Sequence, residues 1–78
     1  MNGVTEHNLG LQPIIELLEK HNLTHHDLVT ASTEQITHKM VTRACKGRKL
    51  SRRVQMKLVK ALNTATEQTY MLKDVFTY

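Results

Sequence analysis

The chain has 78 residues, a formal net charge of +4 and a single cysteine. A chain of this length forms one domain with a small core, and one cysteine excludes an intramolecular disulfide or a zinc site built on cysteine pairs. Residues 1–10 lack the basic and apolar regions of a signal peptide, and no apolar run approaches the roughly 18 residues that cross a bilayer. These features predict a cytoplasmic protein that contacts no membrane.

The positive charge is concentrated in residues 38–60, which we call the basic block. It carries nine Lys or Arg residues and no Asp or Glu, so its charge is +9 against −5 for the rest of the chain. A run of like charge is often a solvated or disordered segment. Here apolar residues recur among the cations every three or four positions, which predicts two amphipathic helices with their cations outward.

The N-terminal part of the chain divides into an arm and a first helix. Residues 1–10 show no periodicity and are expected to form a flexible arm ahead of a single domain over residues 11–78. An apolar stripe predicts the first helix over residues 11–21, with Pro13 in the first turn, where proline is tolerated. Asn22 is the expected stop. Few glycines and prolines, and no strand-like alternation, favour an all-α fold.

The second predicted helix covers about residues 25–32. Thr24 and Asp27 stand at the spacing of a capping box, in which each side chain accepts from the other residue's backbone N–H. Residues 33–35 are expected to form the turn before the third helix, and Thr37 is expected to cap that helix. The two helices and this turn make a candidate helix-turn-helix.

The basic block supplies the third and fourth predicted helices. The third covers about residues 37–46, and Gly47 can take the left-handed conformation that ends a helix. Ser51 has a side-chain oxygen suited to cap the fourth helix. The polar stretch 64–69 interrupts the apolar pattern, although Ala65 and Glu67 could extend the fourth helix. A short final helix, within residues 70–78, would then close the core.

In this order the segments resemble the lambda-repressor and Cro type of helix-turn-helix domain over about residues 11–76. The resemblance is carried by LTHHDLVTAS, ITHKMVTRACKGRKLS, VKALN and LKDVF. It implies a compact all-α bundle of about five short helices that binds double-stranded DNA and regulates transcription, with residues 37–46 in the major groove. Two features depart from the family's pattern. The turn is about two residues longer and lacks its glycine, and His25 stands where the family often has a Gln.

The resemblance also assigns candidate DNA contacts. In this motif the N-terminal part of the recognition helix meets base edges, where Arg and Lys pair with guanine and Thr contacts thymine. The candidates for base readout are His38, Lys39, Thr42 and Arg43. Phosphates suit the flanking cations and the helix termini. The candidates for phosphate contact are His25, Lys46, Arg48, Lys49, Arg52 and Arg53.

Other partners remain open on the sequence alone, because net charge does not distinguish DNA from other polyanions. One alternative is a protein-protein adaptor that docks an acidic partner on the basic face, and another is a binder of structured RNA. The basic block would also be compatible with a merely solvated surface. A domain this small would bury little surface on DNA and bind weakly. A homodimer on two half-sites is therefore expected, with residues 70–78 as the candidate interface.

Catalysis and metal binding are not predicted. His21, His25 and His26 are close in sequence, but the expected helix break separates the first from the others, and no third ligand stands near. Cys45 has the phase of a small core residue on its helix. The chain contains no paired nucleophile and base and no glycine-rich phosphate loop. We therefore expect neither an enzyme nor a metal, cofactor or small-molecule ligand.

Overall fold

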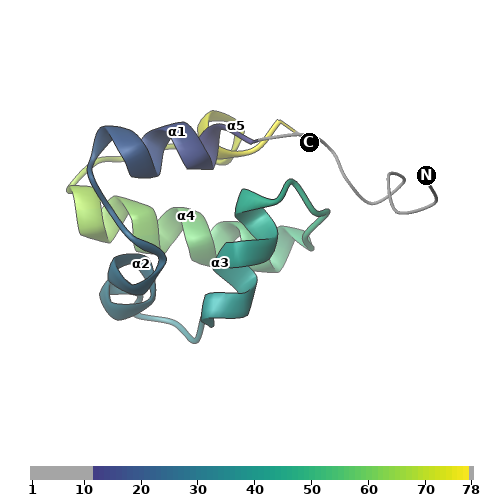
Figure 1. Cartoon of the computed structure of the whole chain (residues 1–78), viewed down its shortest axis with the longest axis horizontal. Helices are drawn as coiled ribbons and strands as arrows, with labels where there is room; N and C mark the ends of the chain where they lie inside the picture. Colours follow the sequence, from purple (N-terminus) through teal and green to yellow (C-terminus); the bar gives the residue numbers. More distant parts are fainter. Residues whose placement is uncertain (1–11, 78) are drawn as a thin grey trace.

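The computed structural model describes residues 12–77 and contains five helices and no strand in that range. They are α1 (Pro13–Lys20), α2 (His25–Ala31), α3 (His38–Cys45), α4 (Arg52–Thr66) and α5 (Leu72–Val75) (Figure 1). The predicted all-α class is confirmed. The predicted N-terminal arm lies outside the described residues. No helix between residues 12 and 77 has the length and apolar character that a bilayer span requires.

The long helix α4 is the centre of the bundle. Helix α2 packs against both α4 and α3, while α5 packs against α4 and α1. Helix α3 also packs against α1. In Figure 1, α1 and α5 lie above α4 and α2 lies below it, while α3 crosses in front of α4. Helix α3 is therefore held by α2 and α1, and α2 is held by α4.

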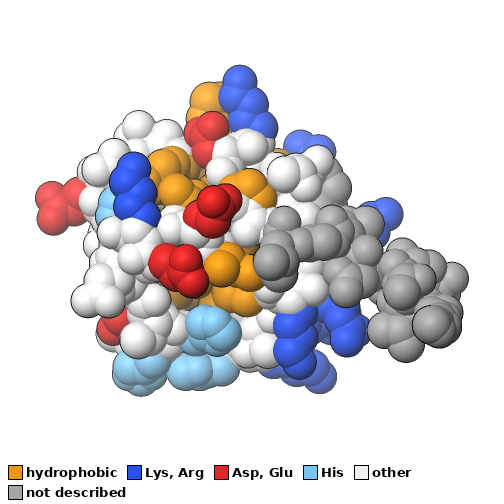
Figure 2. All heavy atoms as spheres, turned by 45° about the horizontal axis from the view of Figure 1, so that its top comes forward, with side chains coloured by type: hydrophobic (Ala, Val, Ile, Leu, Met, Phe, Trp, Pro, Cys, Tyr) orange, Lys and Arg blue, Asp and Glu red, His pale blue; other side chains and the backbone are white. Residues whose placement is uncertain are grey.

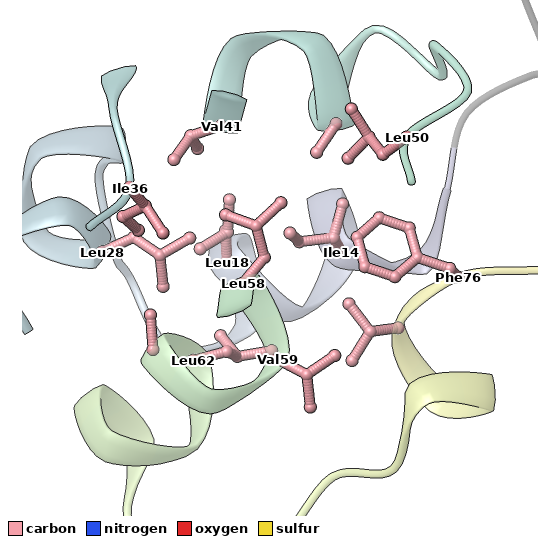
Figure 3. Packing of buried hydrophobic residues seen from close by; sticks show 13 residues of the cluster. Ile14, Leu18, Leu28, Ile36, Val41, Leu50, Leu58, Val59, Leu62 and Phe76 are labelled. Carbon is pink, nitrogen blue, oxygen red and sulfur yellow. The ribbon is translucent and has the colours of Figure 1, made fainter. Parts of the chain in front are cut away.

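The core is formed by apolar side chains from all five helices and from the loops beside them. The largest fully buried ones are Ile14, Leu28, Val41, Leu58, Leu62 and Val75. Figure 3 shows Leu58 of α4 between side chains of the other helices, with the Phe76 ring beside Ile14. Because burying one such side chain contributes about 1.5–3 kcal/mol, these contacts are the main stabilisation of the fold.

The three predicted N-cap residues, Thr24 of α2, Thr37 of α3 and Ser51 of α4, are confirmed. Thr24 and Asp27 form the capping box: the Thr24 N–H donates to Asp27 Oδ2 at 2.8 Å, and the Asp27 N–H donates to Thr24 Oγ1 at 3.1 Å. Thr37 Oγ1 accepts from the third N–H of α3 at 3.2 Å, and Ser51 Oγ accepts from the third N–H of α4 at 3.3 Å. Local side-chain chemistry therefore fixes where each helix begins.

The polar stretch 64–69 is helical in its first part, because α4 continues to Thr66, an extension that the sequence left open. The hydroxyls of Thr64 and Thr66 donate to backbone carbonyl oxygens one turn earlier, at 3.0 and 2.8 Å. These bonds satisfy the polar side chains without leaving the helix. The helix ends at Glu67, whose φ of 58° is left-handed. Helices α1 and α2 each end one residue earlier than predicted.

Two amide side chains hold the ends of the domain together. Gln12 is buried, and its Oε1 accepts from the backbone N–H and the hydroxyl of Thr77, at 2.7 and 2.9 Å. The side chain of Asn63 donates to the Tyr70 carbonyl at 3.0 Å and accepts from the Tyr70 N–H at 2.7 Å. These bonds dock the C-terminal segment on α1 and α4.

Candidate nucleic-acid interface

One face of α3 forms a shallow, positively charged hollow. Val41 and Ala44 are buried in the core, so the opposite side of the helix faces outward. The hollow has a volume of about 350 Å³, and its lining residues are Lys39, Thr42, Arg43, Lys46 and Arg48. Four of the five are cations and none is acidic. A surface of this composition attracts polyanions.

The turn after α3 brings Arg48 into this hollow. Gly47 has a φ of 75°, which is the left-handed conformation that the sequence predicted. The Arg48 N–H donates to the Arg43 carbonyl at 3.0 Å, and the Gly47 N–H donates to the Ala44 carbonyl at 3.2 Å. These two bonds are the Schellman arrangement, which turns the chain back along its helix. Arg48 is therefore held beside the α3 side chains by backbone geometry.

His25, a predicted phosphate contact, lies at the interface between α2 and α3. Its Nδ1 is 3.5 Å from Thr42 Oγ1, and its Nε2 is 3.4 Å from Cys45 Sγ. Both ring nitrogens thus have partners on α3. This placement favours a role in fixing the angle between the two helices over a contact with phosphate.

Cys45 is half-buried beside this histidine and packs against the core. Burial raises the pKa of the Cys45 thiol, because the thiolate would lose hydration. A protonated thiol is a donor, so the consistent arrangement has Cys45 donating to His25 Nε2 and His25 Nδ1 donating to the Thr42 hydroxyl oxygen. The thiol then serves as a packing group with a weak hydrogen bond.

His38, predicted to read bases, is exposed at the first residue of α3 but lies outside the hollow. Its ring stacks on that of His26, with centroids 5.6 Å apart and an interplanar angle of 27°. Figure 2 shows histidine side chains gathered next to a group of Lys and Arg side chains. Across residues 12–77, no cluster of three or more His, Cys, Asp or Glu side chains is arranged to hold a metal.

The remaining predicted phosphate contacts are not part of the α3 hollow. Lys49 is exposed in the loop before α4. Arg52 and Arg53 are exposed in the first turn of α4 and line a second, larger hollow that shares no residue with the first. The structure thus places five of the predicted DNA contacts in the α3 hollow: Lys39, Thr42, Arg43, Lys46 and Arg48. Arg52 and Arg53 line the other hollow.

Sequence reasoning missed the partners that orient these side chains. The pairing of His25 with α3 and the stacking of His26 on His38 depend on how two helices cross, which no spacing in the sequence encodes. It also missed the apolar part of the second hollow, which contains Met56, Val59 and Leu72. One signal for this hollow was available in the sequence. The helical period of α4 places Met56 on the outward face, where a large apolar side chain indicates an interaction surface.

No family model, curated protein or solved structure matches the chain. The five helices and the α3 hollow define a small all-α protein with a cationic helix face.

Proposed function

We propose that the protein binds double-stranded DNA with α3 in the major groove and acts as a transcriptional regulator of the cytoplasm. The supporting observation is the convergence of Lys39, Arg43, Lys46 and Arg48 on one hollow, whose lining residues within the described range 12–77 include no acidic side chain. An α-helix fits the major groove, and Arg or Lys side chains on its outer face reach the O6 and N7 of guanine. Base contacts are assigned to Lys39, Thr42 and Arg43.

The support given to α3 also favours this proposal. The helix begins at a capped residue, ends in a Schellman turn and is bonded to α2 through His25, so its outer face is held in one orientation. A fixed helix loses less conformational freedom when it binds. The connection between α2 and α3 runs over residues 32–37. This connection is longer than the turn of the lambda-repressor type. The angle at which α3 enters the groove is therefore expected to differ from that of the lambda-repressor type.

Duplex DNA is favoured over structured RNA by the shape of the proposed reader. The major groove of A-form RNA is deep and narrow and does not admit a helix. Within the proposal, Lys46 and Arg48 contact phosphates beside α3. The phosphate contacts of Lys49, Arg52 and Arg53, which lie outside the α3 hollow, stay predictions from the sequence. Dimerisation through residues 70–78 also stays a prediction. Val75 and Phe76 from that segment are already buried in the protein's own core.

The test is selection from a randomised duplex pool with the full chain, followed by fluorescence anisotropy on the recovered duplex. Arg43→Ala is expected to relax base preference and weaken binding by about 1–3 kcal/mol. Arg52→Ala, if the predicted phosphate contact exists, weakens all sequences alike and lowers the salt dependence.

The matched control is Lys20→Ala, which removes an exposed cation from the last turn of α1, outside the basic block. It is expected to leave the affinity for the recovered duplex unchanged within about twofold, since Lys20 lines neither hollow and an exposed charge is screened by salt. Recovery of no sequence, or equal weakening by Lys20→Ala and Arg43→Ala, would contradict the proposal. Binding of hairpin RNA in preference to any duplex would replace it with the RNA alternative.

A further inference from the structure

The second hollow lies on the exposed side of α4 and extends to the start of α5. Its volume is about 980 Å³, and its lining residues are Glu34, Arg52, Arg53, Met56, Lys57, Val59, Lys60, Asn63, Thr64 and Leu72. It is thus larger than the α3 hollow and differs from it in chemistry. The α3 hollow has cations and one hydroxyl, whereas the α4 hollow has both apolar and charged parts.

The apolar part consists of Met56, Val59 and Leu72. Met56 is 59% exposed and, with Met71, is one of two large hydrophobic side chains within residues 12–77 that reach so far into solvent. Met71 stands directly before Leu72. Methionine is flexible and polarizable and is over-used at surfaces that accept apolar partners. An exposed apolar patch with a charged rim is typical of an interaction site.

The charged part is cationic at one end and neutral at the other. Lys60 Nζ is 3.2 Å from Glu34 Oε2, so this pair largely cancels its own charge. Across residues 12–77, Arg52, Arg53 and Lys57 have no carboxylate within ion-pair distance. The positive potential of the α4 hollow is therefore concentrated toward the N-terminal end of the helix. An occupant with carboxylates at that end and apolar side chains over Met56 would complement both parts.

We propose that the α4 hollow binds an acidic, amphipathic helix of a partner protein. DNA does not fit this composition, because a phosphate backbone has no apolar side chains to cover Met56 and Leu72. A second copy of the chain would place Arg52, Arg53 and Lys57 against the same cations across a two-fold axis, which is repulsive. The described residues offer no strand edge for an extended peptide, so a helix lying in the groove is the matching mode.

The proposal is tested with a fluorescein-labelled peptide of about 16 residues, long enough to form a helix on binding. Leu side chains at i, i+3 and i+7 form its apolar face, and Glu side chains flank it. A scrambled peptide of the same composition is the reference. We expect the full chain to bind the amphipathic peptide at least about tenfold more tightly than the scrambled one. Only the amphipathic peptide matches the apolar part and the charged part of the α4 hollow at the same time.

Variants of two lining residues locate the binding on α4. Met56→Gln is expected to weaken binding of the amphipathic peptide by about fivefold or more, while Met56→Leu keeps it, because only the former removes apolar contact. Lys57→Glu is expected to weaken binding about tenfold, and Lys20→Glu on α1 should change it by less than about twofold. Helical circular dichroism of each variant confirms that it is folded.

Three outcomes would overturn the proposal. The first is equal binding of the two peptides, which leaves only net charge as the attraction. The second is equal weakening by Lys20→Glu and Lys57→Glu, which would place the peptide elsewhere. The third is a wild-type dimer in sedimentation that Met56→Gln dissociates, which would assign the α4 hollow to a second copy of the chain. None of these results depends on whether the protein binds DNA.

Discussion

The two hollows are formed by one continuous basic block, yet they differ in the chemistry that surrounds the cations. Among the described residues that line the α3 hollow, Thr42 accompanies four cations and supplies a hydroxyl. In the α4 hollow the cations surround Met56, Val59 and Leu72, and Glu34 neutralises one of them. The turn through Gly47 and the cap at Ser51 separate the two helices, so neighbours in sequence lie on different surfaces.

A run of like charge in a sequence therefore does not define one binding site. Cations with polar neighbours suit phosphates and base edges, whereas cations around exposed apolar side chains suit a protein that is both acidic and apolar. The protein would then bind DNA with α3 and a partner with α4. Four predictions follow, in order of expected effect.

The largest effect is expected from Leu58→Ala, which should abolish both binding activities. Leu58 is fully buried on α4, which carries one hollow, and it belongs to the same core cluster as Val41 and Ala44 of α3, which carries the other. Its truncation should cost about 2–5 kcal/mol of unfolding free energy, a large part of the stability of a small domain. Urea denaturation followed by circular dichroism measures the loss. Met56→Ala, an exposed change on the same helix, should stay within about 0.5 kcal/mol.

The next largest effect separates the two hollows directly. Arg43→Ala should weaken binding of the selected duplex by about 1–3 kcal/mol and leave the amphipathic peptide's affinity within about twofold. Lys57→Ala should do the reverse, because Lys57 lines only the α4 hollow. Anisotropy with both ligands on both variants gives four affinities. Loss of both ligands in either variant would mean that the hollows act as one surface.

A smaller effect on stability is expected from His25→Ala. This change removes the contacts of His25 Nδ1 with Thr42 and of Nε2 with Cys45, both part-buried, and should cost about 1–2 kcal/mol of unfolding free energy. Weaker DNA binding should accompany that loss, because α3 is no longer fixed against α2. If DNA binding weakens while urea denaturation is unchanged, His25 contacts phosphate, as the sequence suggested.

The smallest effect concerns acid stability and should spare both hollows. Hydrogen bonds from the Thr24 N–H and hydroxyl hold the pKa of Asp27 below its usual value. The ionised carboxylate therefore stabilises the fold above the pKa of the unfolded chain, and this contribution is lost as the pH falls through the folded-state pKa. Between about pH 5 and pH 2, Asp27→Asn should show a weaker fall in thermal midpoint than wild type. An unchanged acid profile would contradict this assignment.

The sequence predicted the fold well where the causes are local. Thr24, Thr37 and Ser51 cap the helices that follow them, and Gly47 ends α3, because each depends on one residue and its next few neighbours. The sequence left the end of α4 open, since a polar composition does not reveal that the hydroxyls of Thr64 and Thr66 donate to carbonyl oxygens of their own helix.

The candidate site could be predicted only in part. The outward face of α3 follows from its helical period, so Lys39, Thr42, Arg43 and Lys46 were identified together. The separation of Arg52 and Arg53 was not foreseen, because it depends on the direction of α4 after the turn. The buried Gln12 and the pairing of His25 with Cys45 join residues far apart in the chain. Such tertiary contacts leave no signal in local spacing.

The most direct test of the central claim is a ¹H–¹⁵N correlation titration of the full chain with the duplex recovered by selection. If α3 is the DNA reader, backbone shifts concentrate in residues 38–48, and residues 56–64 of α4 shift little. The acidic peptide should then shift the α4 residues and spare α3. Duplex-induced shifts centred on α4, or a chain for which no duplex produces shifts, would contradict the claim that α3 binds DNA.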